Sequence, residues 1–431
     1  MKFGSDWHPV CLKDLQAPRK YALNGGPFGS KLVSRDYTPK GIPVIRGANL
    51  ASDGYFSLDE LVFVSEDKAN ELYANNAHPG DLVFTQRGTL GQVGIIPNTC
   101  DYDRFVISQS QMKLTVDEAK ADPYFLYYYF RAPSTIQTIH NVALSSGVPH
   151  INLEILRNFQ LYVPYLPTQR RIASILSAYD DLIENNTRRI AILEEMAHLL
   201  YREWFVHYRF PGHEDVPMVD SALGPIPQGW EVVRFTDIAD VLSGGTPKTT
   251  MPEFWNGSIP WFTPKDAPSS FYVSQTEKSI TERGLQKCSS QLYPKDTVFI
   301  TARGTVGKVL LAAVAMAMNQ SCYALRGKAG VDQYFVFLAI RDRIAQLRQT
   351  AHGAVFDTII VNTFERLDIV CPPSGLVRQF SASVSDTFDL ILNLLNKNAN
   401  LRRTRDLLLP RLVSGEVDVE TSRQEWKGAM K

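Results

Sequence analysis

Two short arginine-glycine-threonine loops hold the residues best suited to contact a polyanion. They read RGTLG at 87–91 and RGTVG at 303–307. Arginine can bind a guanine edge through two hydrogen bonds or clamp a phosphate, and glycine lets backbone N–H groups approach a phosphate closely. The alternative is a tight turn whose arginine pairs with a carboxylate. The candidate DNA-binding residues in these loops are Arg87, Gly88, Thr89, Arg303, Gly304 and Thr305.

Further candidates lie in two glycine-rich turns and after two matching strand-like segments. Small residues and a following lysine occur near residues 25–31 and 244–248, where a simple loop is the alternative. Polar residues that suit base edges follow GIPVI at 41–45 and GSIPWF at 257–262. The candidate DNA-binding residues of this group are Gly26, Ser30, Lys31, Arg46, Asn49, Gly245, Thr246, Lys248 and Lys265. The Gln-Ser pairs at 109–110 and 320–321 are expected to belong to buried hydrogen-bond networks.

Motifs for catalysis, nucleotide binding and metal binding are incomplete. In GTVGKV at 304–309, Val309 stands where a P-loop needs Ser or Thr, and Gln92 replaces Lys308 in the matching loop. The pair Pro372-Pro373 follows Cys371, where an adenine methyltransferase needs Asp or Asn. Five scattered cysteines and eight histidines show no metal-ligand spacing. The chain is therefore expected to carry no catalytic residue, metal or cofactor.

The candidate loops belong to an internal repeat. GDLVFTQRGTLG at 80–91 matches KDTVFITARGTVG at 295–307, and further matches follow in the same order. The offset between copies falls from 223 (Trp7 and Trp230) to 208 (Pro164 and Pro372), as loop insertions in a duplicated domain would produce. Each copy begins with about 150 residues of short apolar stretches between turn residues, which predicts a compact α/β or α+β domain.

A long helix is expected after each globular part, from about Pro167 to Phe205 and from about Leu376 to Leu409. Apolar residues recur every seven residues in both, which predicts that the helices form a coiled coil. A second seam of Ile175, Leu182 and Met196 is expected in the first helix. The expected interface positions are Ile172, Tyr179, Asn186, Leu193, Leu200, Phe380, Ile391, Leu394, Asn398 and Leu401.

The two asparagines on these seams, Asn186 and Asn398, suggest a role in fixing the register, with local solvent exposure as the alternative. Each helix would be roughly 50–60 Å long at about 1.5 Å per residue. A pair of such helices alone is typical of an oligomerisation stalk. Beside a repeated globular domain, it favours a rigid spacer between two domains. The basic run at 402–405 is compatible with DNA or partner contact, or with a solvated helix face.

Composition and charge set the broad class. The chain has 431 residues, of which 44% are hydrophobic and 21% charged, which indicates a folded protein of several domains. The net charge is zero, which weighs against an extensive basic surface without excluding DNA binding. The longest apolar runs are too short to span a bilayer, and the first residues make a poor signal peptide. A cytoplasmic protein without membrane contact is expected.

Three strings resemble conserved regions of the specificity subunits of type I restriction-modification systems. The segments 168–208 and 401–419 resemble the central and distal conserved regions, and LGPIPQGWEVV at 223–233 resembles the linker that opens the second recognition domain. The resemblance covers essentially the whole chain. It implies two target-recognition domains separated by two long antiparallel coiled-coil helices, with pseudo-twofold symmetry. Each domain would read one half of a split site on double-stranded DNA.

The resemblance also implies partners and domain limits. Two adenine-N6 methyltransferase (modification) subunits and ATP-using restriction (translocase) subunits would bind this chain, and S-adenosylmethionine, ATP and Mg²⁺ would reside on them. The alternatives are a coiled-coil adaptor that does not bind DNA and an autonomous nuclease or ATPase. The expected parts are recognition domain 1 at 1–165, a helix at 166–209, a linker at 210–228, recognition domain 2 at 229–373, a helix at 374–412 and a tail at 413–431.

Overall fold

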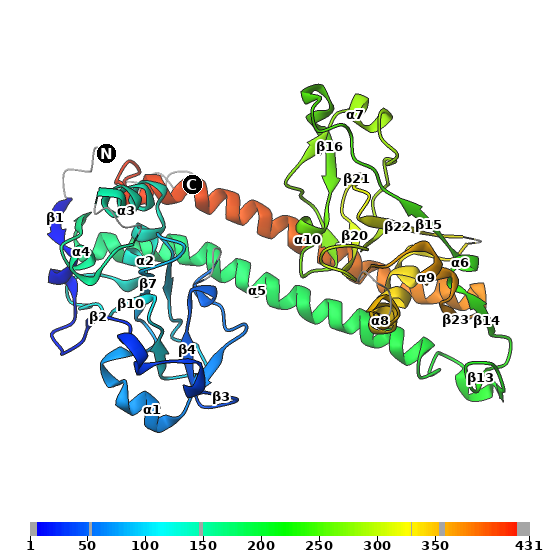
Figure 1. The fold of residues 1–431 in the computed structure, drawn as a ribbon, viewed down its shortest axis with the longest axis horizontal. Coiled ribbons are helices and arrows are strands. Elements are labelled where there is room, and N and C mark those ends of the chain that lie inside the picture. Colours follow the sequence, from blue (N-terminus) through cyan, green and yellow to red (C-terminus); the bar gives the residue numbers. More distant parts are fainter. Residues whose placement is uncertain (1–6, 51–53, 146–149, 329, 353–357, 420–431) are drawn as a thin grey trace, which may run out of the picture. The chain divides into compact units, whose positions relative to one another are not determined.

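The computed structural model describes residues 7–50, 54–145, 150–328, 330–352 and 358–419. The chain forms two compact units (Figure 1). Unit 1 comprises Met1–Asn185 and Asn398–Lys431, and unit 2 comprises Asn186–Lys397. Each unit therefore contains a globular part and one half of each of two long helices.

Unit 1 is a mixed α/β domain with two main sheets. One has the antiparallel order β2-β10-β7-β8, the other has the mixed order β3-β5-β4-β9-β6, and β1 pairs with β11. The strands are β1 (His8–Cys11), β2 (Leu23–Gly25), β3 (Tyr37–Thr38), β4 (Ile42–Ile45), β5 (Val62–Val64), β6 (Asn76–Ala77), β7 (Leu82–Thr85), β8 (Val93–Ile95), β9 (Phe105–Ile107), β10 (Gln111–Leu114) and β11 (Gln160–Val163). The helices are α1 (Glu66–Glu71), α2 (Pro123–Arg131), α3 (Pro133–Ser145) and α4 (Leu153–Arg157).

The core of unit 1 forms around helix α2. Asp122 accepts a hydrogen bond from the Phe125 amide, and Pro123 occupies the first turn, so the helix begins where a side-chain cap and a pre-set φ angle coincide. All residues from Phe125 to Phe130 are buried, against strands such as β8. Strand β7 is buried on both faces, which explains its continuous apolar sequence LVFT.

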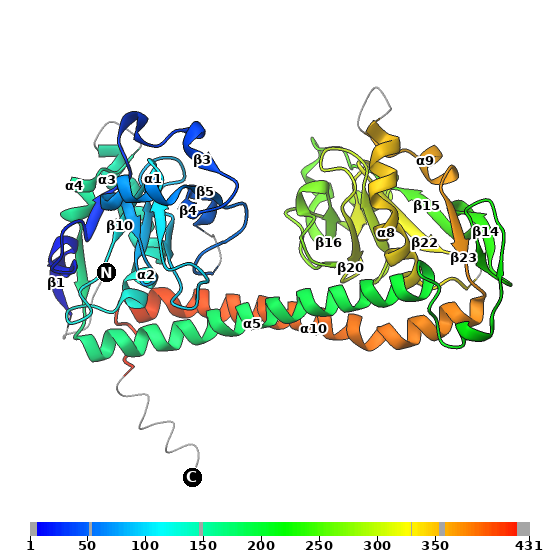
Figure 2. The same ribbon diagram turned by 90° about the horizontal axis from the view of Figure 1, so that it is seen from below.

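Unit 2 repeats this plan with different strand lengths. Its sheets have the orders β15-β22-β19-β20-β17 and β18-β16-β21, and β14 pairs with β23. The strands are β14 (Glu231–Arg234), β15 (Ala239–Ser243), β16 (Trp255–Phe262), β17 (Tyr272–Val273), β18 (Ser279–Ile280), β19 (Val298–Thr301), β20 (Val309–Ala312), β21 (Ala317–Met318), β22 (Cys322–Gly327) and β23 (Asp368–Cys371). The helices are α6 (Phe235–Ile238), α7 (Glu282–Gln286), α8 (Gln333–His352), which packs on β20 and β22 (Figure 2), and α9 (Val361–Glu365). A short hairpin of β12 (Met218–Val219) and β13 (Ile226–Pro227) lies in the expected linker.

The two long helices, α5 (Leu166–Phe205) and α10 (Ser374–Val413), pack antiparallel in both units. In unit 1 the side-chain Nδ2 of Asn398 donates to the Ile183 carbonyl over 3.2 Å. In unit 2 the Trp204 ring lies 5.6 Å from that of Phe380. The heptads predicted an end of the second helix near Leu409, but the helix continues through Pro410 to Val413. Burial of Leu409, Leu412 and Val413 in the unit 1 core explains why the last turn persists after the proline.

The seam of α10 was predicted correctly, whereas the second seam of α5 was wrong by one residue. Phe380, Ile391, Leu394 and Asn398 are all at most 2% exposed, and Leu401 is half-buried. On α5 the buried positions are Leu176, Ile183, Ile190, Ala197 and Trp204, while Leu182 and Met196 are exposed. Ile172 and Asn186 are buried, and Tyr179, Leu193 and Leu200 are half-buried as the other seam. The residues that point inward follow one another in alternating steps of four and three along the helix. The expected second seam began three residues after Ile172, where the step is four, so it points outward.

Candidate nucleic-acid interface

The two arginine-glycine-threonine loops are held by the same backbone hydrogen bonds in both units. In unit 1 the Gln86 amide donates to the Ser110 carbonyl (2.7 Å), and the Ile151 amide donates to the Gln86 carbonyl (3.2 Å). In unit 2 the Ala302 amide donates to the Ser321 carbonyl (2.8 Å), and the Ile359 amide donates to the Ala302 carbonyl (3.1 Å). Each loop is therefore fixed at its base by two chain segments that are distant in sequence.

Glycine is required at the tip of each loop. Gly88 and Gly304 have φ angles of 101° and 77°, a conformation that other residues rarely adopt. The tip residues Arg87, Gly88 and Thr89 are exposed, as are Arg303, Gly304 and Thr305. The loops thus present their polar groups to solvent from a rigid base.

The side chains of the two loop arginines have no partner among the described residues. Among the described residues, the guanidinium groups of Arg87 and Arg303 form no hydrogen bond or ion pair, so the alternative of a turn closed by an arginine-carboxylate pair finds no support there. An exposed guanidinium on a rigid turn retains all five donors for a ligand.

The glycine-rich turns approach the Gln-Ser segments so closely that a side chain would collide. A Cβ atom on Gly26 would overlap the Ser108 carbonyl, and one on Gly244 would overlap the Asn319 carbonyl. The structural counterpart of Gly26 is therefore Gly244, one residue earlier than the sequence match. Gly245 is also buried, against the Ser289 backbone and hydroxyl.

Two exposed glutamines tie these turns down, which corrects the expectation of a buried network. The Gln109 side chain donates to the carbonyls of Gly29 and Leu32, the latter over 3.2 Å. In unit 2 the Thr246 hydroxyl donates to the Gln320 side chain. Ser30, Lys31 and Lys248 remain exposed beside the turns.

Asn49 is buried and stabilises the backbone around its own turn. Its side-chain oxygen accepts from the Arg46 amide (2.9 Å), its Nδ2 donates to two carbonyls, and the residue is 0% exposed. Such a side chain cannot reach a base edge, so Asn49 is not a candidate for DNA contact. Asp266 caps the Thr263 amide in the same way (2.8 Å), which makes Asp266 the counterpart of Asn49 and leaves Lys265 exposed.

Arg46 is half-buried and partly engaged, because its guanidinium donates to the Glu60 carbonyl (2.5 Å). Arg405, in the basic run of α10, is 5% exposed and paired with Asp180, so it belongs to the interior of unit 1 and not to a solvated face. The packing around Arg46 and Arg405 therefore decides how much of each guanidinium is available to a ligand.

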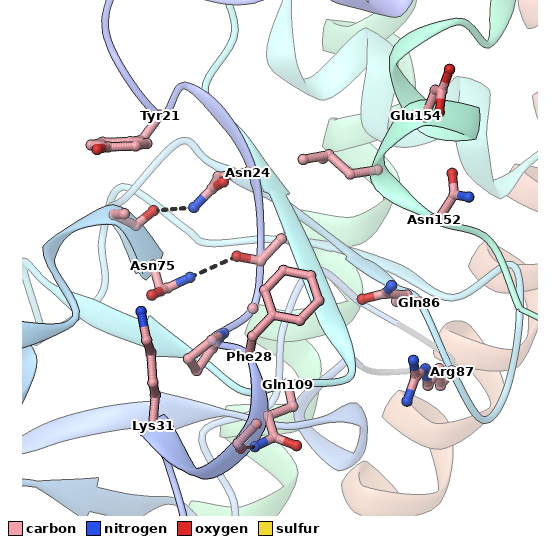
Figure 3. A pocket seen from close by; sticks show the side chains of 16 residues that line it. Tyr21, Asn24, Phe28, Lys31, Asn75, Gln86, Arg87, Gln109, Asn152 and Glu154 are labelled. Carbon is pink, nitrogen blue, oxygen red and sulfur yellow. Dashed lines mark hydrogen bonds between the residues drawn. The ribbon is translucent and has the colours of Figure 1, made fainter.

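A hollow of about 450 Å³ adjoins the loop of unit 1 (Figure 3). Its lining joins the glycine-rich turn, the end of β7 and the start of α4. It includes the expected residues Gly26, Lys31 and Arg87 together with Phe28 and Asn152, which the sequence analysis missed. Phe28 had one usable signal, since an aromatic residue between a proline and a glycine fits no periodic core pattern.

The described residues contain no group of three His, Cys, Asp or Glu side chains placed to hold a metal ion. None of the helices in that part of the chain is both long and apolar enough to cross a membrane.

Comparisons with known proteins give a consistent result. Residues 4–195 and 227–400 match the family model described as the type I restriction modification DNA specificity domain. The chain is 25% identical over 424 residues to the type I restriction enzyme MjaIX specificity subunit of Methanocaldococcus jannaschii, covering 97% of this chain and 95% of that protein. It is 23% identical over 399 residues to the HindI specificity subunit of Haemophilus influenzae, covering 78% and 86%. The crystal structure of the type I restriction-modification S subunit from M. genitalium shares the fold, with a TM-score of 0.58 at 16% identity over 96% of this chain and 98% of that one.

Proposed function

The chain belongs to the type I restriction-modification DNA specificity family, and we propose that each of its two units reads one half of a two-part site on double-stranded DNA. The observation that carries this proposal is the repeated loop, in which matching backbone bonds present, in both units, an arginine that has no partner among the described residues. A protein of this family recognises DNA, and the chemistry on DNA belongs to other subunits. Cytoplasmic residence follows from a DNA target.

The proposed contact set divides by exposure. Arg87 and Arg303 are the candidates for base edges, because an arginine fork discriminates guanine by two hydrogen bonds. Exposed lysines and loop backbone groups are the candidates for phosphate contacts that position the protein. The residues of this second group are Ser30, Lys31, Lys248, Lys265 and the backbone of Gly88, Thr89, Gly304 and Thr305.

We also propose that the outer faces of α5 and α10 bind two methyltransferase subunits, and that restriction subunits join this assembly. Large apolar side chains are exposed at positions that repeat at the helix offset of 208. Leu182 and Leu390 form one such pair, and Leu199 and Leu407 form the other. Solvent-exposed leucines at repeated positions are suited to two copies of one partner. S-adenosylmethionine, ATP and Mg²⁺ would then be bound by these partners.

Replacement of one recognition domain tests the proposal. We expect that exchanging residues 7–164 for the equivalent part of another specificity protein changes one half of the methylated sequence and leaves the other half intact. Sequencing of methylated adenines in a host that carries the chain and its methyltransferase measures both halves at once. If no sequence-specific methylation depends on the chain, the coiled-coil adaptor is the better interpretation, and if both halves change together, the units do not read independently.

A matched insertion tests whether the helices set the gap between the half-sites. One heptad added after Asn186 and one near Leu394 keep the seams in phase and lengthen each helix by about 10.5 Å. At about 3.4 Å per base pair, we expect the non-specific gap to grow by roughly three base pairs while both half-site sequences are kept. Methylation at sites with the original gap would show that the helices only bind partners.

A further inference from the structure

The hollow of unit 1 has an exposed aromatic ring at its centre. Phe28 is 84% exposed, and Figure 3 shows its ring between Lys31 on one side and Gln86 and Arg87 on the other. The backbone around it is nevertheless held, because the Gln109 side chain binds the Gly29 and Leu32 carbonyls and the Lys31 amide donates to the Phe28 carbonyl (3.3 Å). An aromatic face presented to water on a fixed turn is a stacking surface without a partner.

The polar groups around this ring offer both donors and acceptors. Asn24 and Asn75 donate their amide N–H groups to the carbonyls of Ala74 and Gly25, each over 2.7 Å, so each has its Oδ1 left as an acceptor (Figure 3). Asn152 accepts from the Ile155 amide (2.8 Å) through its Oδ1, so its Nδ2 is left as a donor. The Gln86 side chain forms no hydrogen bond among the described residues. Mixed donors and acceptors of this kind match the edge of a nucleobase.

The charges of the hollow are arranged for a nucleotide. The ammonium of Lys31 and the guanidinium of Arg87 form no ion pair among the described residues, and both suit backbone phosphates. Glu154 also lines the hollow and lies beside Asn152 in Figure 3. Its carboxylate disfavours a phosphate there and can accept from an exocyclic amine of cytosine or adenine.

From these features we propose that the hollow of unit 1 takes up one nucleobase turned out of the duplex, stacked on Phe28 and held at its edge by the surrounding amides. The proposal rests on the proposed function, since the base comes from the half-site that unit 1 reads. The volume of about 450 Å³ lies within the range of roughly 300–1,000 Å³ typical of small-molecule sites. Stacking on an aromatic ring contributes to binding a base whatever its identity, and the amides and Glu154 then select among bases.

Unit 2 lacks the same constellation. By strand and helix register, Thr246 stands in the place of Phe28, Leu242 in that of Asn24 and Ile360 in that of Asn152. A threonine tied to Gln320 offers no stacking face. The inference is therefore specific to unit 1.

Fluorescence of 2-aminopurine tests the inference. The probe is placed at successive positions of the unit 1 half-site in duplex DNA bound by the full chain with its methyltransferase partners, without S-adenosylmethionine. We expect a rise at one position that F28A abolishes and F28W retains, while K40A, at an exposed lysine of unit 1 outside the hollow, leaves it unchanged. A mismatch at that position should tighten binding to the original protein, because unpairing no longer opposes capture. F28A should lose this preference and bind the matched site about 5- to 150-fold more weakly.

The outcomes separate the two proposals. Specific binding in which no probe position distinguishes F28A from the original protein overturns the nucleobase site and leaves the proposed function standing. A uniform loss of affinity in F28A, equal for matched and mismatched DNA, also overturns it, since Phe28 is then only a surface contact. If the original complex shows no sequence-specific binding at all, the proposed function fails first and the inference fails with it.

Discussion

Units 1 and 2 build the same framework around interiors of different chemistry. In unit 1 the Tyr128 hydroxyl donates to Asp180 (2.6 Å), Asp180 pairs with Arg405, and the Tyr55 hydroxyl lies 3.4 Å from that of Tyr128. Asp180 and Arg405 have side chains only 2% and 6% exposed. Tyrosine ionisation plays no part here, because burial raises the pKa of Tyr128 far above its usual range.

The equivalent positions of unit 2 hold an apolar cluster. Phe271 corresponds to Tyr55, since its carbonyl accepts from Leu311 as that of Tyr55 accepts from Ile95. Residues of the two long helices correspond at an offset of 208. Phe388 therefore occupies the position equivalent to Asp180, and Ala197 the position equivalent to Arg405. The ring of Phe271 lies 4.8 Å from Phe337, the counterpart of Tyr127, and 5.7 Å from Phe388. Leu338 stands at the position of Tyr128, because Leu126 and Val336 donate to the equivalent first carbonyls of α2 and α8, those of Asp122 and Asp332.

A second pair of positions differs in the same direction. Lys113 on β10 and Asp81, the residue before β7, form a buried ion pair at 3.9 Å in unit 1. The strand register places Ala324 and Thr297 at these positions in unit 2. Both interiors support the same arginine-glycine-threonine loops, so the backbone bonds, not the side chains that fill the interior, determine the loop geometry. A buried ion pair and a well-packed apolar group are often close in stability, which allows this divergence.

Removal of one partner from the unit 1 network should have the largest effect. R405A leaves the Asp180 carboxylate buried without its guanidinium, and we expect unit 1 to lose about 3–5 kcal/mol of stability. Hydrogen exchange should rise in α2 and the N-terminal half of α5, with little change in α8 of unit 2. R403A, at an exposed position of the same helix, is the matched control and should change stability by less than about 0.5 kcal/mol. Equal effects of both variants would contradict the importance of the buried pair.

Conversion of the whole network should restore what R405A loses. The combined variant Y55F, Y128L, D180F and R405A gives unit 1 the side chains of unit 2. We expect an unfolding free energy between that of the original protein and about 4 kcal/mol above it, because four apolar side chains replace a buried ion pair and two buried hydroxyls. Urea titration of both proteins gives the difference in unfolding free energy. A variant no more stable than R405A would show that the two interiors are not interchangeable, and that packing around residue 180 differs between the units.

The sequence predicted the features that depend on local pattern and on repetition. The two long helices, the seam of α10 and the paired loops all follow from heptads and matched strings. Exposed apolar residues such as Leu182 and Met196 concealed the true seam of α5, since spacing alone does not separate a core leucine from a surface one. Asn49 was predicted to bind DNA, but it caps its own turn. An asparagine side chain suits both roles, so residue type alone does not distinguish them. The hollow could not be predicted, because it needs the turn at Phe28 and the helix start at Asn152 to meet in space.

The loops provide the test of what the units share. R87A and R303A each remove one exposed guanidinium, and we expect each to weaken specific DNA binding by about 1–3 kcal/mol. The loss should be confined to one half-site per variant, since the arginines lie in different units. Binding titrations against DNA with single substitutions in each half-site measure this directly. K40A, which removes an exposed lysine outside the proposed contact set, is the control. Loss of discrimination at both half-sites in either variant would mean that the units read DNA jointly.

The smallest expected difference is in pH dependence. Burial lowers the pKa of Lys113 below 10.5, and the Asp81 carboxylate only partly opposes this. The folded chain therefore binds fewer protons at this amine than the unfolded chain, so stability rises with pH in the window between the lowered value and 10.5. The gain cannot exceed about 1.4 kcal/mol per pH unit. Burial also raises the pKa of Asp81, which makes stability fall with pH above 3.8, so the slope from Lys113 is best measured close to 10.5. Urea titrations at pH 9, 9.5 and 10, just below the ordinary value, should show this slope in the original protein and its loss in the double variant D81T and K113A, which carries the unit 2 residues. An identical slope in both proteins would assign the pH dependence to other groups and remove this distinction between the units.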